Sequence, residues 1–412
     1  MNHDTASFVN QNKQMPERRI PYAAQWLDDA DIQAVVDVLK NDFLTTGPKI
    51  AEFEAALCEI TEAKYAVAVN SGTAALHAAC FAAGISDSDE VITSPITFAA
   101  TANAVLYVGG TPVFCDIDPE TWNIDPSKIE ALITAKTKAI IPVHFTGQPC
   151  QMDRILEIAK KHRLVVIEDA AHALGARFNG KPVGSIGAMT CFSFHPVKHI
   201  TTGEGGAVTT DSRELYQKLI QFRAHGITRD AELLTYATQN GADSEHSSVI
   251  SPVSVEPWYY EQHFLGFNYR LTDIQAALGV SQLKKLPAFL QRRKDIVRTY
   301  NDAFQPLHDV GKLQLPAIMA GANSAWHLFV IKLPPEHRNR VFHALQEKGL
   351  NVNLHYIPVY LHPYYRQLGY REGLCPEAEF FYSGIITLPL YPKMSDDDVA
   401  YVIRCIRETV SS

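Results

Sequence analysis

The sequence lacks a long uninterrupted apolar run of the kind that crosses a membrane. Its longest apolar stretch, residues 65–85, is broken by Asn70, Ser71, Thr73 and His77. A membrane-spanning helix needs about 20 consecutive apolar residues, so a strand, a turn and a helix explain this stretch better. Neither end of the chain has the charged start and apolar middle of a secretory signal peptide, and we expect no membrane association.

Positive charge is also scarce. The chain has 37 lysines and arginines against 45 aspartates and glutamates, which gives a formal net charge of −8. A protein that binds nucleic acid usually presents a basic surface to the phosphates. The charge balance therefore argues against a nucleic-acid partner.

The seven cysteines are scattered, odd in number and without any CxxC spacing. This pattern predicts neither a disulfide framework nor a zinc site, and we expect no metal. Buried free thiols are typical of a reducing compartment, so the expected location is the cytoplasm.

The 412 residues, 46% of them hydrophobic, are enough for a large core and two domains. Residues 1–19 are polar and without periodicity, which predicts a flexible extension. Residues 20–270 are predicted to form a large ligand-binding domain. Residues 271–412 are predicted to form a long connecting helix and a smaller α+β domain.

Short apolar runs alternate with helical patterns between residues 64 and 210. The runs are "KYAVAVN", "EVITSP", "PVFCDI", "AIIPVH", "LVVIEDAAH" and "AMTCFSF". Alternating strands and helices predict an α/β fold with a mainly parallel sheet covered on both faces. Such folds bind ligands at the carboxyl ends of the strands, where Ser71, Phe98, Asp169 and Lys198 are expected.

A helix is predicted soon after residue 27, with Ile32, Val35, Val36 and Leu39 on its apolar face. Further along, one continuous helix is predicted from near residue 271 to beyond residue 291, and a strand over "VNLHY", residues 352–356. The polar stretch 225–262 ends in the aromatic segment 257–260, which predicts an ordered loop that packs against some other surface.

The stretch "SFHPVKHITTGEGGAVTT" places Lys198 between a buried strand and a glycine-rich turn. A lysine in this position is either a surface residue or an amine that is paired or used chemically. Asp169 ends a neighbouring apolar strand, where it could keep the ring nitrogen of pyridoxal phosphate protonated. The alternative for Asp169 is to cap a helix over "AAHALGA".

A phosphate site is expected where "NSGTAAL" follows a strand and opens a helix, with Gly72 and Thr73 in its first turn. Helix capping by Ser71 or Thr73 is the simpler alternative. Ser193 could add a hydroxyl, and Phe98 could stack on the cofactor ring or belong to the core. Since neither GxGxxG nor GxxxxGK[ST] occurs, the combination favours a fold-type I pyridoxal phosphate enzyme.

From about residue 20 onward the chain resembles the DegT/DnrJ/EryC1/StrS family of sugar aminotransferases. The motifs that carry the resemblance are "DFLTTGPKIAEFE", "NSGTAAL", "EDAAHALGA", "SFHPVKHITTGEGGAVTT", "FRAHGI" and "GFNYRLTDIQAALG". The stretches "PWYYEQ" and "HYIPVY" are similar to the subgroup that acts in pseudaminic acid biosynthesis. The resemblance implies a homodimer that transfers an amino group from L-glutamate to a UDP-linked 4-keto sugar.

The resemblance also implies roles for single residues. Lys198 would form the Schiff base with pyridoxal 5′-phosphate and shuttle the proton, and Asp169 would pair with the pyridine nitrogen. His172 stands where many relatives have glutamine near the phenolic oxygen. Phosphate contacts are implied for Gly72, Thr73, Ser193 and, from the neighbouring subunit, Asn268. Nucleotide-sugar contacts are implied for Tyr22, Asp42, Phe43, Leu44, Thr45, His355, Tyr356, Ile357 and Pro358.

Three other functions compete with this interpretation, and the sequence argues against two of them. A 3-dehydratase of the same family would replace the lysine by histidine, whereas here Lys198 is present and His199 merely follows it. A 4-aminotransferase for another UDP- or dTDP-linked keto sugar would use the same residues. A non-catalytic regulator of this fold would need a DNA-binding module, for which residues 1–20 are too short.

Overall fold

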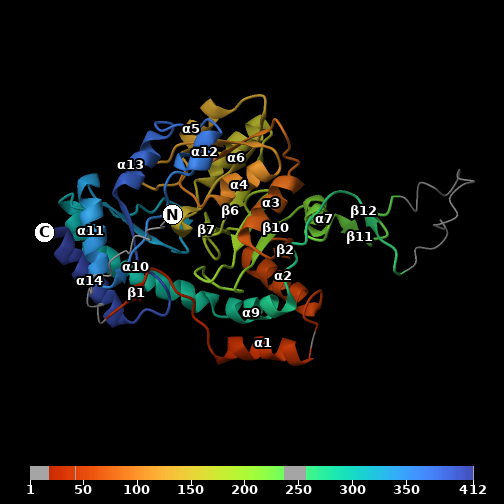
Figure 1. The fold of residues 1–412 in the computed structure, drawn as a ribbon, viewed down its shortest axis with the longest axis horizontal. Coiled ribbons are helices and arrows are strands. Elements are labelled where there is room, and N and C mark those ends of the chain that lie inside the picture. Colours follow the sequence, from red (N-terminus) through yellow and green to blue (C-terminus); the bar gives the residue numbers. More distant parts are fainter. Residues whose placement is uncertain (1–17, 42, 236–256, 412) are drawn as a thin grey trace, which may run out of the picture.

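A seven-stranded sheet forms the centre of the molecule in the computed structural model, which describes residues 18–41, 43–235 and 257–411 (Figure 1). The strand order is β2-β10-β9-β6-β5-β3-β4, and β10 alone runs antiparallel to its neighbours. The strands are β2 (Tyr65–Val69), β3 (Glu90–Thr93), β4 (Thr111–Phe114), β5 (Thr137–Ile141), β6 (Val165–Asp169), β9 (Met189–Ser193) and β10 (Gly206–Thr210). The predicted α/β fold with a mainly parallel sheet is confirmed.

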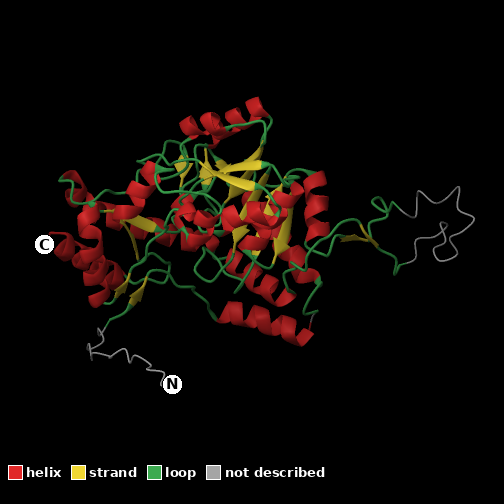
Figure 2. Ribbon diagram, turned by 45° about the horizontal axis from the view of Figure 1, so that its top comes forward, coloured by secondary structure: helices red, strands yellow, loops and turns green. Residues whose placement is uncertain are grey.

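Helices cover both faces of this sheet, as Figure 2 shows in the layering of helices and strands. Alternate residues of each strand enter opposite cores, so that Val67 and Ile141 face one layer while Ala68 and Ile140 face the other. One layer contains α3 (Gly72–Ala82), α4 (Ala100–Tyr107) and α7 (Arg213–Phe222). The other contains α2 (Pro48–Thr61), α5 (Pro126–Ile129), α6 (Met152–His162) and α9 (Asp273–Leu283).

The C-terminal part packs helices against the antiparallel pair β14 and β16. Its elements are α10 (Leu286–Asp309), β14 (Phe329–Lys332), α11 (Pro335–Glu347), β15 (Leu350–Asn351), α12 (Pro363–Gln367), α13 (Pro376–Gly384), β16 (Ile385–Leu388) and α14 (Asp396–Ser411). Near the N-terminus, β1 (Ile20–Pro21) pairs with β15, and Arg18 forms an ion pair with Asp398. Residues 18–21 therefore lie against the C-terminal part.

Two of the predicted elements are wrong in their extent. The continuous helix from residue 271 is two helices, α9 and α10, separated at Lys284 and Lys285. Pro287 favours the break, because proline has no N–H to bond to the preceding turn of a continuous helix but fits well in the first turn of a new one. The predicted strand 352–356 is reduced to one isolated bridge between Asn353 and Thr387.

Helix α1 (Asp29–Asn41) lies along α9 at the outside of the molecule (Figure 1). Its predicted apolar face is wrong, because Ile32 and Leu39 are 58% and 56% exposed while Asp31 is buried. The Asp31 carboxylate accepts hydrogen bonds from the Ser281 hydroxyl at 2.6 Å and the Gln282 amide at 2.7 Å. These polar contacts, together with the buried Val38, turn the side of α1 that carries Asp31 toward α9.

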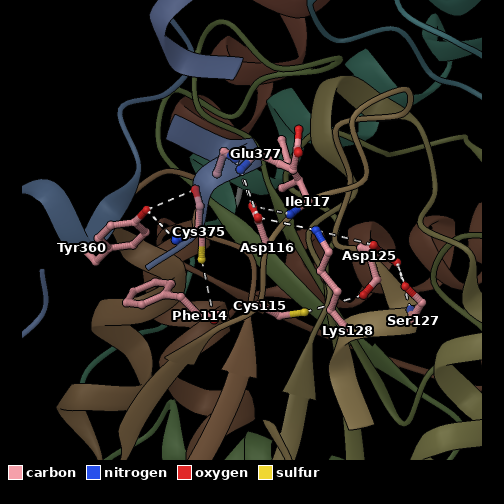
Figure 3. Close-up of polar contacts among 11 residues, drawn as sticks. Phe114, Cys115, Asp116, Ile117, Asp125, Ser127, Lys128, Tyr360, Cys375 and Glu377 are labelled. Atoms are coloured by element: carbon pink, nitrogen blue, oxygen red, sulfur yellow. Dashed lines mark hydrogen bonds and ion pairs between the residues drawn. The ribbon is translucent and has the colours of Figure 1, made fainter. Parts of the chain in front are cut away.

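The two parts of the chain meet at Asp116, directly after β4 (Figure 3). Its carboxylate accepts hydrogen bonds from the backbone N–H groups of Glu377 at 3.0 Å and Ala378 at 2.9 Å, in the first turn of α13. The Lys128 ammonium lies 3.5 Å from the same carboxylate. An apolar cluster that includes Phe114 and Phe381 continues the junction. Asp116 thus caps a helix of the C-terminal part from the edge of the central sheet.

The described ends of the stretch 225–262 contain β11 (Ile227–Thr228) and β12 (Glu261–Gln262), which pair as antiparallel strands at one side of the molecule (Figure 1). At its aromatic end Trp258 and Tyr260 are 70% and 52% exposed in the single chain, and residues 236–256 lie outside the described residues, so the predicted packing of this loop stays a prediction. Three further short strands, β7 (Arg177–Phe178), β8 (Lys181–Pro182) and β13 (Ala322–Asn323), form a separate small sheet. Among the described residues, no helix is long and apolar enough to span a bilayer.

Candidate active site

Lys198 lies in the turn that connects β9 to β10. The turn is closed by backbone hydrogen bonds from Phe194 N–H to the Gly205 carbonyl, 2.8 Å, and from Thr202 N–H to the Phe194 carbonyl, 3.0 Å. The Lys198 side chain is half-buried. Burial lowers the pKa of Lys198 to about 8, although the nearby Asp169 carboxylate opposes part of this shift. A substantial fraction of this amine is therefore neutral near physiological pH.

Asp169 is the last residue of β6 and is buried. One carboxylate oxygen accepts a hydrogen bond from the Thr101 hydroxyl at 2.6 Å, and the other accepts one from the Ala171 N–H at 3.1 Å. Residues 170–176 form turns, so the alternative that Asp169 caps a helix there is wrong. The carboxylate is held at both oxygens near the amine of Lys198.

His172 lies in the turns after β6 with its ring buried. Its Nε2 is 3.2 Å from the Tyr356 hydroxyl, while its buried Nδ1 has no hydrogen-bond partner in the described part of the chain. Burial, helped by the positive charge of Lys198, holds the pKa of His172 well below its usual range. A neutral imidazole therefore faces the site.

The N-terminus of α3 lies against the end of β9. Ser71 caps this helix by accepting a hydrogen bond from the Ala74 N–H at 3.0 Å. A Cβ atom on Gly72 would lie 2.8 Å from Cβ of Ser193, and one on Gly206 would lie 2.4 Å from the Ser71 carbonyl oxygen. Only glycine permits these close approaches, which bring Gly72, Thr73 and Ser193 to one place.

These residues fit pyridoxal phosphate. The first turn of α3 offers unpaired backbone N–H groups and the positive end of a helix dipole to a phosphate. The Asp169 carboxylate can accept a ring N–H, the buried Nδ1 of His172 needs a partner, and Lys198 supplies an amine of lowered pKa. Phe98 is 64% exposed, with its ring centroid 6.3 Å from that of Tyr356, so it lies outside the core clusters of the described residues and its ring is available to a ligand.

A second group of predicted residues extends the site toward the C-terminal part. The ring centroids of Tyr22 and His355 are 5.2 Å apart, and Nδ1 of His355 lies 2.9 Å from the Thr387 hydroxyl. Burial, with a smaller effect from Lys198, lowers the pKa of His355 to about 3. Ile357 is half-buried and Pro358 is buried, next to the hydrogen bond from Val359 N–H to the Pro95 carbonyl.

Other predicted residues lie away from this group. Phe43, Leu44 and Thr45 are exposed, and the Leu44 carbonyl accepts a hydrogen bond from the N–H of Asp273 in α9. Asp42 lies outside the described residues. Asn268 is exposed, and its carbonyl accepts a hydrogen bond from the Asn70 amide at 3.4 Å.

Four polar residues of the site were missed by sequence reasoning. Thr101 bonds to Asp169, Thr97 bonds to Thr101, Thr387 bonds to His355, and the His327 ring lies 4.5 Å from that of His172. Thr97 lies in the bend before α4 and Thr101 in the first turn of that helix, so no helical spacing in the sequence predicted their contact. Thr387 and His327 come from distant parts of the sequence and gave no signal either.

The sheet, its two helical layers and this constellation define a fold-type I pyridoxal phosphate-dependent aminotransferase. More particularly, the chain belongs to the DegT/DnrJ/EryC1/StrS aminotransferase family, whose model matches residues 25–407. The spore coat polysaccharide biosynthesis protein SpsC of Bacillus subtilis is 43% identical over 397 residues, which cover 95% of this chain and 97% of SpsC.

Solved structures agree with this assignment. Spr1654 of Streptococcus pneumoniae, solved in PMP and PLP forms, superposes in the PMP form with a TM-score of 0.86 at 33% identity, covering 96% of this chain and 98% of that one. Helicobacter pylori PseC, an aminotransferase of pseudaminic acid biosynthesis, gives 0.83 at 32% identity, covering 96% and 100%. The protein is therefore a sugar aminotransferase that uses pyridoxal phosphate.

Proposed function

We propose that the protein transfers the amino group of L-glutamate to C4 of UDP-2-acetamido-2,6-dideoxy-β-L-arabino-hex-4-ulose. The product would be UDP-4-amino-4,6-dideoxy-N-acetyl-β-L-altrosamine, made in the cytoplasm for pseudaminic acid biosynthesis. The observation that carries the chemical part is the half-buried Lys198 of lowered pKa beside Asp169 and His172. The similarity to PseC supports the sugar.

In this proposal Lys198 and Asp169 are the catalytic residues. Pyridoxal phosphate supplies an aldehyde that carries the amino group and a ring that withdraws electrons. Lys198 holds the cofactor covalently and, as a neutral amine, moves the proton between donor or acceptor carbon and cofactor. Asp169 keeps a proton on the ring nitrogen because its anionic carboxylate, held by Thr101, stabilises the adjacent positive charge.

The phosphate of the cofactor is assigned to Gly72, Thr73 and Ser193, and His172 to the edge of the ring. The nucleotide sugar is assigned to the side formed by Tyr22 and His355–Pro358. Phe43–Thr45 stay proposed sugar contacts, although they lie away from that side in the single chain. Burial keeps His355 neutral and Tyr356 protonated, because it lowers the pKa of the first and raises the pKa of the second. His355 can therefore donate a hydrogen bond to a diphosphate or sugar oxygen, and Tyr356, whose proton is directed to His172, can accept one from a sugar hydroxyl; neither repels the negative charge of the substrate.

We further propose that the active form is a homodimer in which Asn268 reaches the phosphate of the neighbouring subunit. Asn268 is exposed and follows the exposed Phe267 in the sequence. Tyr107 and Phe267, 55% and 38% exposed, both contact the ring of His77. Covering these aromatic side chains would favour association. Residues 20–270 would form the cofactor domain and residues 271–412 the smaller domain.

A different sugar is the second candidate. SpsC, at 43% identity, shares more of the sequence than PseC and is named for spore coat polysaccharide, so another UDP- or dTDP-linked 4-keto sugar has independent support. The chemistry at Lys198 would be unchanged. Only the residues on the sugar side would meet a different hydroxyl pattern.

A competition assay tests the proposed substrate. The L-arabino and D-xylo UDP-4-keto sugars are offered at equal concentration with glutamate. We expect the L-arabino sugar to be preferred at least tenfold, which corresponds to about 1.4 kcal/mol at the transition state. A tenfold preference for the D-xylo sugar, or turnover of a dTDP-sugar alone, would overturn the sugar assignment and leave the aminotransferase assignment intact.

A further inference from the structure

The carboxylate of Asp169 is one end of a buried chain of hydroxyl groups. Oδ2 of Asp169 lies 2.6 Å from the Thr101 hydroxyl, and the Thr101 hydroxyl lies 2.6 Å from the Thr97 hydroxyl. All three residues are at most 4% exposed.

The direction of the hydrogen bonds follows from counting protons. An ionised carboxylate can only accept, so Thr101 must donate its single hydroxyl proton to Asp169. The Thr101 oxygen can then only accept from Thr97, which must be the donor of the second bond. The chain therefore runs from Thr97 through Thr101 to Asp169, and each bond polarises the next.

The fold fixes both threonines firmly. Thr101 is in the first turn of α4, where its N–H bonds to the Phe98 carbonyl at 3.2 Å, and Thr97 precedes the helix by one turn. On the far side of the carboxylate, the Ala171 N–H binds Oδ1 at 3.1 Å. With one donor at each oxygen, the carboxylate plane cannot rotate freely, and a further donor can approach only from the remaining open side.

We propose that Thr101, supported by Thr97, is a positioning residue that fixes the Asp169 carboxylate for the ring nitrogen of the cofactor. The proposal rests on the role of Asp169 proposed above. A hydrogen bond to an ionised carboxylate is stronger than one between two neutral groups. The Thr101 hydroxyl therefore stabilises both the charge and the orientation of the Asp169 carboxylate. Without the Thr101 hydroxyl, the Asp169 carboxylate would become ordered only when the cofactor binds.

The test compares two ligands that differ only at the ring nitrogen. The full-length chain, freed of cofactor, is titrated with pyridoxal 5′-phosphate and with its 1-deaza analogue, in which a C–H replaces the nitrogen. The measured quantity is the dissociation constant of the 1-deaza analogue divided by that of pyridoxal 5′-phosphate, which is the preference for the ring nitrogen. For Thr101→Val, which keeps the shape and removes the hydroxyl, we expect this ratio to fall about tenfold or more. Thr101→Ser, which keeps a hydroxyl, should restore it.

Two controls separate positioning from packing. Thr93→Val removes another fully buried hydroxyl, which donates to the Ile141 carbonyl at 2.8 Å and does not touch Asp169. It should leave the ratio unchanged. Thr97→Val interrupts the chain one bond further away and should lower the ratio less than Thr101→Val, which keeps the test informative if the Thr101 variant does not fold.

The outcomes distinguish this inference from the function on which it rests. If Asp169→Asn abolishes the preference for the ring nitrogen but Thr101→Val does not change it, the positioning role is wrong. If Thr101→Val weakens the binding of both ligands by the same factor, Thr101 contributes to packing only and the positioning role is likewise wrong. If Asp169→Asn itself leaves the ratio unchanged, the proposed role of Asp169 fails.

Discussion

The Tyr356 hydroxyl lies 3.2 Å from Nε2 of His172, and the two rings are nearly parallel with centroids 6.1 Å apart. This contact joins the segment 355–358 of the C-terminal part to the turns that follow β6. If Tyr356 donates the hydrogen bond, the single proton of the neutral imidazole lies on Nδ1, the nitrogen without a partner in the described residues. The sugar side and the cofactor side of the site are thus linked through one imidazole.

Tyr356→Phe should lower kcat/KM for the keto sugar about five- to tenfold. The change removes one hydrogen bond of roughly 1 kcal/mol and leaves Nε2 of His172 without its donor. Steady-state kinetics with the purified variant measures the effect. Tyr360→Phe is the matched control, because its hydroxyl donates to Glu379 at 2.5 Å, outside this contact. Equal kcat/KM for wild type and Tyr356→Phe would show that the contact does not serve the reaction.

Incorporation of pyridoxal phosphate into the cofactor-free chain should become faster as pH rises, with a midpoint near 8. Lys198 reacts as the neutral amine, and its lowered pKa of about 8 makes that form dominant above this pH rather than above 10.5. In Asp169→Asn the midpoint should shift below 8, because the carboxylate that raises the pKa of Lys198 is gone. Stopped-flow absorbance measures both rates. A midpoint near 10.5 in wild type would contradict the burial of the amine.

Glu168→Gln should destabilise the fold, because His144 and Glu168 form a buried pair with both side chains 0% exposed. Nδ1 of His144 accepts a hydrogen bond from the Cys150 N–H at 3.0 Å, so its Nε2–H must donate to Glu168 at 2.8 Å. The other oxygen of Glu168 accepts hydrogen bonds from the Gly187 N–H and the Thr190 hydroxyl, both at 2.7 Å. The amide NH2 of a glutamine would therefore face a donor on either side, and one buried donor left unsatisfied costs about 1–3 kcal/mol.

Denaturant unfolding of the cofactor-free chain measures this loss. Glu130→Gln is the control, since Glu130 also pairs with a histidine, His162, at 2.8 Å but on the exposed surface. We expect no shift of its unfolding midpoint. Similar midpoints for the two variants would mean that the buried pair adds nothing to stability.

The core of the site could be predicted from the sequence because it follows the ends of strands. The apolar runs before Asp169 and Lys198 become β6 and β9, which are adjacent and parallel, so their carboxyl ends meet at one edge. Gly72 is brought to the same edge by β2 and α3. Local periodicity and the rule for parallel sheets were enough to place these three residues.

The rest depends on contacts between distant segments. Ile32 and Leu39 face outward because Asp31 bonds to Ser281 and Gln282, which no local pattern in α1 reveals. The link from Thr387 to His355 crosses 32 residues. Such pairings are decided by tertiary packing, which overrides the local apolar pattern and cannot be read from one segment.

Mixing Lys198→Ala chains with Asn268→Ala chains should restore activity if Asn268 acts in the neighbouring site. In the mixed dimer one site then carries both defects and the other carries none. With random mixing we expect about one quarter of wild-type activity. A mixture of Lys198→Ala with Asp169→Asn is the control, because each chain would spoil its own site and no activity should return. Absence of recovery in the first mixture, despite verified mixed dimers, would place Asn268 in its own site or in none.

The covalent role of Lys198 is the central claim, and borohydride reduction followed by peptide mapping tests it most directly. Reduction fixes the cofactor on the lysine to which it is bound through an imine, and mass spectrometry then locates the adduct. We predict an adduct on the peptide that contains Lys198, and none in Lys198→Ala protein incubated with the same cofactor. An adduct on another lysine of the wild-type protein, or no adduct in protein shown to hold the cofactor, would contradict the account.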